Sequence, residues 1–277
     1  MTVLWIILYM LGFVLLLILT QNVQIFPGAF ISKMQFARRQ EKQIPPGVES
    51  FFLTTPDKVE IEVWRHEETQ KSDLSQYIAI VFHGNGGPVE NFIFTQMWLG
   101  ELGIASYGFD YRGFGRSCGW PSEKGMYTDS DTVVEHVLKR EEIDASKVII
   151  VGISVGSAPA ARAASLHGVR LLILSSAFTD LRSAARAQPL LGWLAPFVWY
   201  QLPTKQFVSE LGETHLLLAR GMQDRIVPPD HSSQLLASYR GSGYNELLSS
   251  DVAGHNMTFF ALKDELKAEL RRMLNPS

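Results

Sequence analysis

Residues 148–157, which read VIIVGISVGS, constrain the fold of this chain more than any other stretch. A run of β-branched residues leads into a glycine, a serine and a second glycine, and an alanine-rich segment follows. This order predicts a strand, a sharp turn and a helix, with Ser154 at the apex of the turn. Such a turn strains the serine backbone and brings strand and helix close together, so the positions two before and two after it must be small. Gly152 and Gly156 meet this requirement.

The pentapeptide alone also fits an ordinary glycine-containing loop between a strand and a helix. A serine hydroxyl is a poor nucleophile at neutral pH, and it becomes reactive beside a base that a carboxylate orients. On a parallel sheet such groups lie in the loops beyond the carboxyl ends of the strands. The hypothesis that Ser154 is a nucleophile therefore requires a base, an acid and an oxyanion hole in loops of that kind.

Composition excludes several function classes. The chain has 277 residues and a net charge of −3, so it is long enough for one sizeable domain with an N-terminal appendage. The absence of a basic patch argues against a nucleic-acid partner. The sequence shows no metal-ligand cluster, so no metal is expected. The single cysteine, Cys118, excludes an internal disulfide and leaves the compartment open.

The appendage is an uncharged apolar stretch, residues 3–20, and the first charged side chain is Lys33. Eighteen helical residues span about 27 Å, close to the hydrocarbon core of a bilayer. The rival interpretation, a cleaved signal peptide, would need a basic start, a shorter apolar core and a small-residue cleavage site, none of which is evident. We therefore predict a single-pass transmembrane anchor over residues 1–22 and a juxtamembrane linker over residues 23–44.

The linker gives the expected orientation. Its aromatic and apolar residues are interleaved with basic ones, a composition that suits the membrane interface: Phe26, Phe30, Ile31, Phe36, Lys33, Arg38, Arg39 and Lys42. Because the basic residues follow the span and none precedes it, the catalytic part is expected on the cytoplasmic side. The glycosylation sequon at Asn256 is a second hint about orientation. A glycan there would lie beside His255, which is identified below as the predicted base, and would obstruct the active site of a lumenal enzyme.

Residues 45–277 alternate between strand and helix patterns. Strands are expected at residues 59–64, 78–82, 104–109, 148–151, 171–176, 215–219 and 246–250, and helices at 89–102, 128–140, 232–239, 257–274 and after Ser157. This alternation predicts an α/β domain with a mostly parallel sheet covered by helices on both faces. An apolar insertion at residues 179–206 interrupts it.

Two of the seven histidines clearly follow expected strands. His255 comes after the last strand, behind the flexible Gly254, and is the predicted base. His83 opens the loop HGNGG, whose backbone N–H groups can point at an anion, and it is assigned to loop structure. The helix patterns around His136, His167 and His231 favour solvated or packing roles for those three.

The predicted acid is Asp224, which lies just past the expected strand at residues 215–219. It gives the chain order Ser, Asp, His that the hydrolase arrangement demands. A role as an Asx-turn residue is the alternative. Asp180, after the preceding strand, is the second candidate, and Asp251 is too close in sequence to His255 to face it easily.

A developing oxyanion needs fixed donors, each worth about 3 kcal/mol. The backbone N–H of Val155, directly after the nucleophile, is the first expected donor. The second is expected from the loop after residues 78–82, at Asn85 or Gly86. The Asn85 side chain has the alternative role of bracing that turn.

Taken together, these residues resemble the α/β-hydrolase superfamily, with Ser154, Asp224 and His255 in that order. More narrowly, residues 110–125, DYRGFGRSCGWPSEKG, are similar to a block of membrane-anchored α/β-hydrolase-domain serine hydrolases, a group that includes monoacylglycerol and lysophospholipid lipases and protein depalmitoylases. The match covers about residues 77–257. It implies an α/β-hydrolase fold for residues 45–277 and no cofactor. Ser157 departs from the pattern, because a second glycine often follows the turn.

Within that block the loop at residues 111–119 is expected to be architectural, with Arg112 bonding neighbouring backbone. Cys118 is not placed as a nucleophile.

The insertion at residues 179–206 is expected to form a short apolar cap. Its large side chains fall within eleven residues: Leu190, Leu191, Trp193, Leu194, Phe197, Val198, Trp199 and Tyr200. If the insertion crosses the active end of the sheet, Trp193, Phe197, Trp199 and Tyr200 would contact an acyl chain. The alternative is that these side chains only pack on the sheet.

The sequence therefore predicts a membrane-anchored serine hydrolase that cleaves carboxylic ester or thioester bonds of lipid-like acyl substrates. A serine peptidase of the same fold is one alternative, although the acidic or amine-recognising site and the larger accessory domain that it usually needs are not evident. A membrane scaffold that kept the fold and lost turnover is the other.

Overall fold

The computed structural model describes residues 2–38, 44–189 and 192–274. Its centre is an eight-stranded sheet in the order β1-β2-β4-β3-β5-β6-β7-β8. The strands are β1 (Val48–Thr54), β2 (Glu60–His66), β3 (Ile78–Phe82), β4 (Ala105–Phe109), β5 (Val148–Ile153), β6 (Leu171–Ser175), β7 (His215–Gly221) and β8 (Asn245–Ser250). From β4 to β8 all neighbours are parallel, whereas β1 and β2 pair antiparallel at one edge. The predicted mostly parallel sheet is confirmed.

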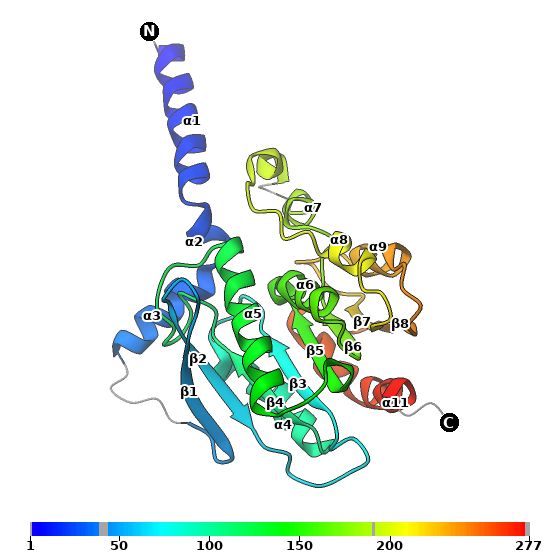
Figure 1. The fold of residues 1–277 in the computed structure, drawn as a ribbon. Helices are drawn as coiled ribbons and strands as arrows, with labels where there is room; N and C mark the ends of the chain where they lie inside the picture. The colour runs from blue at the N-terminus through cyan, green and yellow to red at the C-terminus, as the bar shows by residue number, and fades with distance from the viewer. Residues whose placement is uncertain (1, 39–43, 190–191, 275–277) are drawn as a thin grey trace.

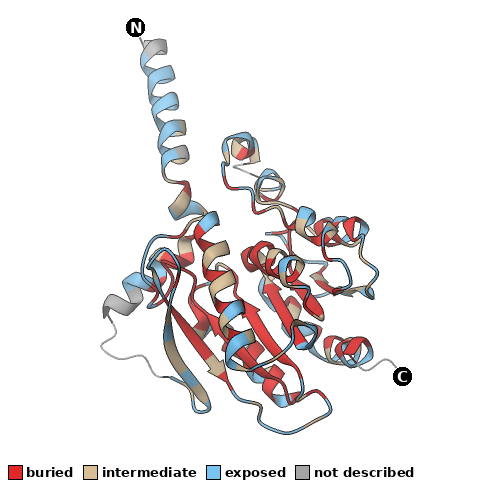
Figure 2. Cartoon of the chain, in the orientation of Figure 1, coloured by how far each residue is buried: buried red, intermediate tan, exposed pale blue. Residues whose placement is uncertain are grey.

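Helices cover both faces of the sheet (Figure 1). The larger are α4 (Ile93–Glu101), α5 (Glu123–Arg140), α6 (Ser157–His167), α9 (Asp230–Ser238) and α11 (Lys263–Leu274). Side chains alternate along each central strand, so that Ile80 and Phe82 join the core beneath α5 and α6 while Ala79 and Val81 join the core beneath α4 and α11. The strands are accordingly buried on both faces (Figure 2).

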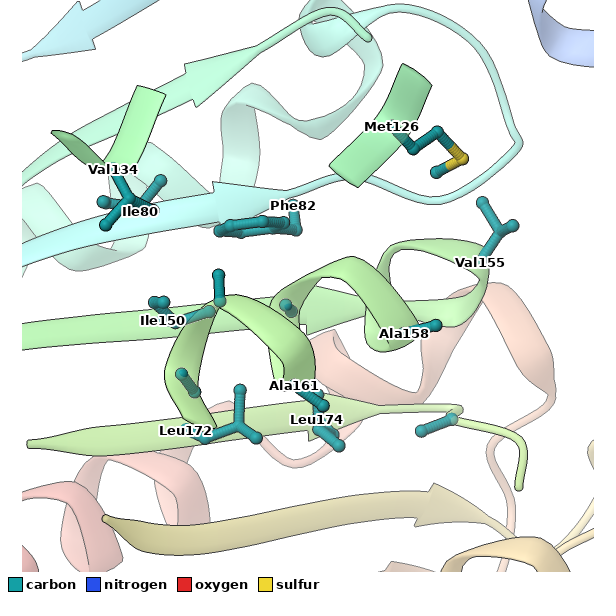
Figure 3. Packing of buried hydrophobic residues seen from close by; sticks show 14 of the residues in the cluster. Ile80, Phe82, Met126, Val134, Ile150, Val155, Ala158, Ala161, Leu172 and Leu174 are labelled. Carbon is teal, nitrogen blue, oxygen red and sulfur yellow. The ribbon is translucent and has the colours of Figure 1, made fainter. Parts of the chain in front are cut away.

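Helix α6 can lie close to the sheet because its inner face is built of alanine. Ala158 and Ala161 are fully buried in the core that α6 shares with β5 and β6, and Ala161 lies next to Leu174 (Figure 3). Small side chains let the helix backbone approach the strands, which fixes the start of α6 directly after the end of β5. Ser154 stands at that junction.

The structure differs from the expected elements at three places. Strand β1 was not expected, because its side chains alternate between half-buried and exposed in a sequence without a continuous apolar run. Helix α5 begins at Glu123 instead of residue 128, since the Ser122 hydroxyl caps it by accepting from Gly125 N at 3.1 Å. The last expected helix is divided into η5 (His255–Met257), α10 (Thr258–Ala261) and α11.

At the N-terminus, helix α1 (Thr2–Leu19) projects from the body with apolar side chains such as Trp5, Tyr9 and Leu11 exposed (Figures 1 and 2). Across the described ranges, no helix combines the length and apolar character needed to cross a bilayer. A transmembrane course for residues 3–20 therefore stays a prediction.

The linker is helical and partly buried. It forms α2 (Gln21–Ile25) and α3 (Pro27–Arg38), while residues 39–43 lie outside the described part. Phe26 was expected at a membrane interface, but its side chain is fully buried and belongs to the main core. The beginning of the linker is therefore packed against the catalytic body.

The insertion at residues 179–206 contains α7 (Leu181–Arg186), the 3-10 turn η4 (Gly192–Phe197) and the start of α8 (Thr204–Ser209). Its two ends are tied together by a hydrogen bond from Leu181 N to Gln201 O at 2.9 Å. Leu190 and Leu191 lie outside the described residues. Below, "the cap" means residues 179–206.

Candidate active site

The turn after β5 holds Ser154 in a strained conformation. Its φ is +51°, in the left-handed region that non-glycine residues seldom adopt. A Cβ on Gly152 would lie 2.6 Å from Ala160 Cβ, and one on Gly156 would lie 2.3 Å from Phe82 O. The two glycines therefore allow β5, β3 and α6 to approach closely while Ser154 points away from the sheet at its carboxyl end.

Ser154, His255 and Asp224 lie side by side, although 101 and 31 residues separate the neighbouring members in sequence. His255 Nε2 lies 2.9 Å from Ser154 Oγ, and His255 Nδ1 lies 2.7 Å from Asp224 Oδ2. The imidazole thus stands between a hydroxyl and a carboxylate at hydrogen-bonding distance from both. This arrangement is suited to moving a proton from the serine to a leaving group.

Asp224 combines two roles that the sequence presented as alternatives. Its Oδ1 accepts hydrogen bonds from Ile226 N and Val227 N, both at 2.8 Å, which is the Asx-turn arrangement. Its Oδ2 faces His255. The other candidate acid, Asp180, instead caps α7 by accepting from Ser183 N at 2.8 Å.

Two residues that sequence reasoning missed, Ser176 and Thr258, hold the His255 loop, and the Thr258 hydroxyl donates to Gly254 O at 3.1 Å. Ser176, which follows β6 with φ +51°, donates its hydroxyl to His255 O at 3.0 Å and lies 3.1 Å from Thr258 Oγ1. A serine at the carboxyl end of the strand next to β5 is the only sequence signal for this contact. Its effect is to fix the backbone that carries the imidazole.

The loop at residues 83–87 passes directly over Ser154. A Cβ on Gly84 would lie 3.3 Å from Ser154 Cβ and 3.2 Å from Ile153 O. The Asn85 side chain donates to Ile25 O, so it braces the linker instead of its own turn. The oxyanion roles of Val155, Asn85 and Gly86 stay predictions, with the backbone N–H as the donor expected from Asn85.

His83 is a buried residue of this loop. Its Nδ1 lies 2.7 Å from Gly84 O, and its ring packs among Phe92, Tyr111 and Phe114 at centroid distances of 4.7–5.4 Å. Burial lowers the pKa of His83 to about 4. The Asp110 carboxylate stays 3.7 Å from Nε2, beyond hydrogen-bonding distance, so burial outweighs it. A neutral, packed ring agrees with the expected role in loop structure.

Arg112 corrects an expectation. It does not bond neighbouring backbone through its guanidinium but forms an ion pair with Asp129 at 2.8 Å and with Asp57 at 2.6 Å. Asp129 is fully buried and its carboxylate also accepts from Arg112 N at 2.8 Å. The ion pair between Arg112 and Asp129 anchors the loop at residues 111–119 to α5. Cys118, in the same loop, is exposed and free.

The cap residues divide into two groups. Trp193, Phe197 and Trp199 are 58%, 48% and 53% exposed, whereas Tyr200 is buried with its ring edge-on to Phe26 at 5.4 Å. The cap reaches the acid loop, since Gln188 Nε2 donates to Ile226 O at 2.9 Å. Contacts of these four side chains with substrate stay predictions.

In the described part of the chain, no group of three or more His, Cys, Asp or Glu side chains is placed to hold a metal ion.

A family model described as serine aminopeptidase, S33, matches residues 75–213, which are 139 of the 277 residues. The chain belongs to this family of α/β-hydrolases. The matched region includes Ser154 and the loop at residues 83–87, and it ends before Asp224 and His255.

Curated relatives are distant but cover most of the chain. Protein bem46 of Schizosaccharomyces pombe is 25% identical over 246 residues, which are 86% of this chain and 81% of that protein. The membrane protein YNL320W of Saccharomyces cerevisiae is 29% identical over 220 residues, 76% of this chain and 74% of that one.

Solved structures share the fold. An α/β hydrolase from Vibrio vulnificus superposes with a TM-score of 0.69 at 20% identity, covering 90% of this chain and 91% of its own. The esterase Pf2001 from Pyrococcus furiosus gives 0.67 at 18% identity, covering 85% and 94%. The predicted α/β-hydrolase fold is confirmed.

Proposed function

We propose that this chain is a membrane-associated serine hydrolase that cleaves carboxylic ester or thioester bonds of lipid-like acyl substrates. The observation that carries the proposal is the row of three side chains in which His255 lies 2.9 Å from Ser154 Oγ and 2.7 Å from Asp224 Oδ2. Their order in the chain and their position at the carboxyl ends of β5, β7 and β8 support the same reading.

In the proposed reaction Ser154 Oγ attacks the acyl carbon while His255 Nε2 takes the hydroxyl proton. Asp224 stabilises the imidazolium and holds its tautomer. The proton then passes to the leaving alkoxide or thiolate, which leaves an acyl-enzyme. Water attacks that ester, gives its proton to His255, and releases the carboxylic acid as the proton returns to Ser154. Val155 N–H and the loop at residues 83–87 would stabilise the oxyanion in both steps.

Two features support an acyl substrate. The cap exposes Trp193, Phe197 and Trp199 and reaches the acid loop through Gln188. Apolar side chains beside a site with a few polar groups suit an acyl chain better than a charged metabolite.

Membrane association is proposed through α1. Its described side chains are almost all apolar and exposed, which is unfavourable for a helix in water. The name of the yeast relative YNL320W as a membrane protein supports this. The basic residues after the helix favour a cytoplasmic catalytic domain.

A serine aminopeptidase is the second candidate, because the matching family carries that description. Such an enzyme would need a carboxylate beside Ser154 to bind the substrate amine. Asp224 is engaged by His255 and by two backbone N–H groups, and Asp180 caps α7. Asp224 and Asp180, the two candidate acids that follow strands β7 and β6, are therefore already engaged, which favours the ester hydrolase.

The test uses the full-length protein in detergent with a fluorophosphonate probe. We expect labelling of the wild type, loss of labelling in Ser154→Ala, and retention in Ser157→Ala. Ser157 is a matched control in the same turn, since its hydroxyl is buried and makes no hydrogen bond in the described structure. An unlabelled wild type, or equal labelling of Ser154→Ala, would favour the scaffold without turnover.

A substrate panel then separates the remaining possibilities. Monoacylglycerols, lysophospholipids, acyl-thioester peptides and aminoacyl anilides are compared by kcat/KM under the same conditions. Preference for the first three classes supports the proposal, and preference for aminoacyl anilides would replace it with the peptidase.

A further inference from the structure

The segment directly after α1 touches two parts of the candidate site that are far away in sequence. Gln21, which is only 6% exposed, donates from Nε2 to Phe197 O at 2.7 Å, and its Oε1 accepts from Trp199 N at 3.3 Å. A single amide thus binds the cap backbone on both sides of Val198. Buried polar side-chain atoms are nearly always hydrogen-bonded, and both ends of the Gln21 amide find their partners on the cap.

Neighbouring residues add to this attachment. The Tyr200 hydroxyl donates to Asn22 Oδ1, and the Tyr200 ring meets Phe26 edge-on at 5.4 Å between centroids. Phe26 is fully buried in the main core. The segment therefore attaches the cap to the body of the domain. The attachment lies at the cap residues that are expected to contact an acyl chain.

The same segment also touches the loop over Ser154. Asn85 Nδ2 donates to Ile25 O, one helical turn after Gln21. A Cβ on Gly28 would lie 2.2 Å from Asn85 O and 3.0 Å from Gly87 N, so the two backbones are in direct contact. Gly28 is required here because any larger residue would push the loop away.

We propose that residues 21–28, which we call the brace, position the cap and the loop at residues 83–87 relative to Ser154. Gln21 acts on the cap and Asn85 acts on the loop, so both are positioning residues for the reaction. This inference rests on the proposed function for its kinetic consequences, while its structural consequences are independent of any activity.

The two contacts predict different kinetic defects. Gln21→Met keeps the length of the side chain and removes both cap hydrogen bonds, so KM for long-chain esters is expected to rise about tenfold with kcat and short-chain esters little changed. Asn85→Asp keeps the size and removes the donor to Ile25 O, so kcat is expected to fall between about tenfold and a hundredfold at every chain length. General destabilisation would lower the activity of both variants alike for all substrates.

The experiment measures kinetics with acetyl and long-chain esters, the rate of fluorophosphonate labelling, and hydrogen exchange of the full-length protein. Gln24→Met is the matched control, since Gln24 is exposed in the same helix and, among the described residues, its amide donates to Leu17 O and Thr20 Oγ1 and not to the cap or the loop at residues 83–87. We expect faster exchange in residues 195–202 for Gln21→Met and in residues 84–87 for Asn85→Asp, slower labelling for Asn85→Asp alone, and wild-type behaviour for Gln24→Met.

Unchanged exchange and kinetics in both variants would overturn the brace, as would identical losses in all three. A protein that shows the local exchange changes but hydrolyses nothing would support the brace and overturn the proposed function.

Discussion

One carboxylate, that of Asp224, joins His255 to the loop that follows β7. Its Oδ2 lies 2.7 Å from His255 Nδ1, and its Oδ1 accepts from Ile226 N and Val227 N at 2.8 Å. The backbone bonds fix the direction in which the carboxylate points, so the imidazole is oriented by a group that is itself held.

Asp224→Asn is expected to lower kcat by about 10⁴-fold with little change in KM or folding. The asparagine oxygen can still accept from the two backbone groups, whereas its NH₂ facing His255 Nδ1 would stabilise the wrong tautomer. Steady-state kinetics and circular dichroism test this. Asp180→Asn is the control, because asparagine caps a helix as well as aspartate does. A larger loss of activity in Asp180→Asn than in Asp224→Asn would show that the acid is misassigned.

Gly156→Ala is expected to lower the free energy of unfolding by about 3 kcal/mol. Its Cβ would lie 2.3 Å from Phe82 O and 2.6 Å from His83 O, and neither backbone can retreat without disturbing β3. Gly168→Ala, with φ +61° but nothing within 4 Å of the new Cβ, should cost about 1 kcal/mol through conformational strain alone. Urea unfolding compares them, and equal losses would argue against the steric explanation.

The buried His83 should make stability depend on pH. Its pKa is about 4 in the folded protein, against 6.5 ordinarily, so only the unfolded chain binds the proton between these values. Stability from this group is fully present above pH 6.5 and declines toward pH 4, by about 2 kcal/mol at pH 5. His83→Asn should flatten the curve in that window. An unchanged slope in His83→Asn would refute the prediction.

Charges placed in α1 should release the protein from membranes without unfolding it. Leu8 and Leu15 are 48% and 55% exposed, so glutamate at both should leave the melting temperature unchanged while costing about 3 kcal/mol each in lipid. Flotation with phospholipid vesicles measures binding. Leu166→Glu, on α6 and 59% exposed, is the control and should still float. Vesicle binding that survives both substitutions would place the membrane contact elsewhere.

The parts of the fold that follow from local pattern could be predicted from the sequence. The apolar strands around Ile80 and Ile150, the turn at Ser154 and the strand-end positions of Asp224 and His255 all depend on residues close in the chain. Ser154 and His255 could be paired because parallel strands bring their carboxyl ends to one edge.

The parts that depend on distant partners could not. Phe26 has the composition of a membrane-interface residue, and only the three-dimensional structure shows that the core encloses it. Arg112 was expected to bond backbone because nothing in the sequence marks Asp57 or Asp129 as its partners. Ser176 likewise meets Thr258 across 82 residues, a contact without a local signature.

The junction between α1 and α2 has a consequence for substrate choice. Thr20 alone separates the two helices, and its backbone bonds to both, since Thr20 N donates to Leu16 O and Val23 N donates to Thr20 O, each at 3.0 Å. With α1 in lipid as proposed, a connection of one residue would hold the catalytic domain at a fixed distance from the membrane. Ser154 would then stay at a constant height above the leaflet. Scissile bonds would then be selected by their depth below the headgroup plane as well as by their chemistry.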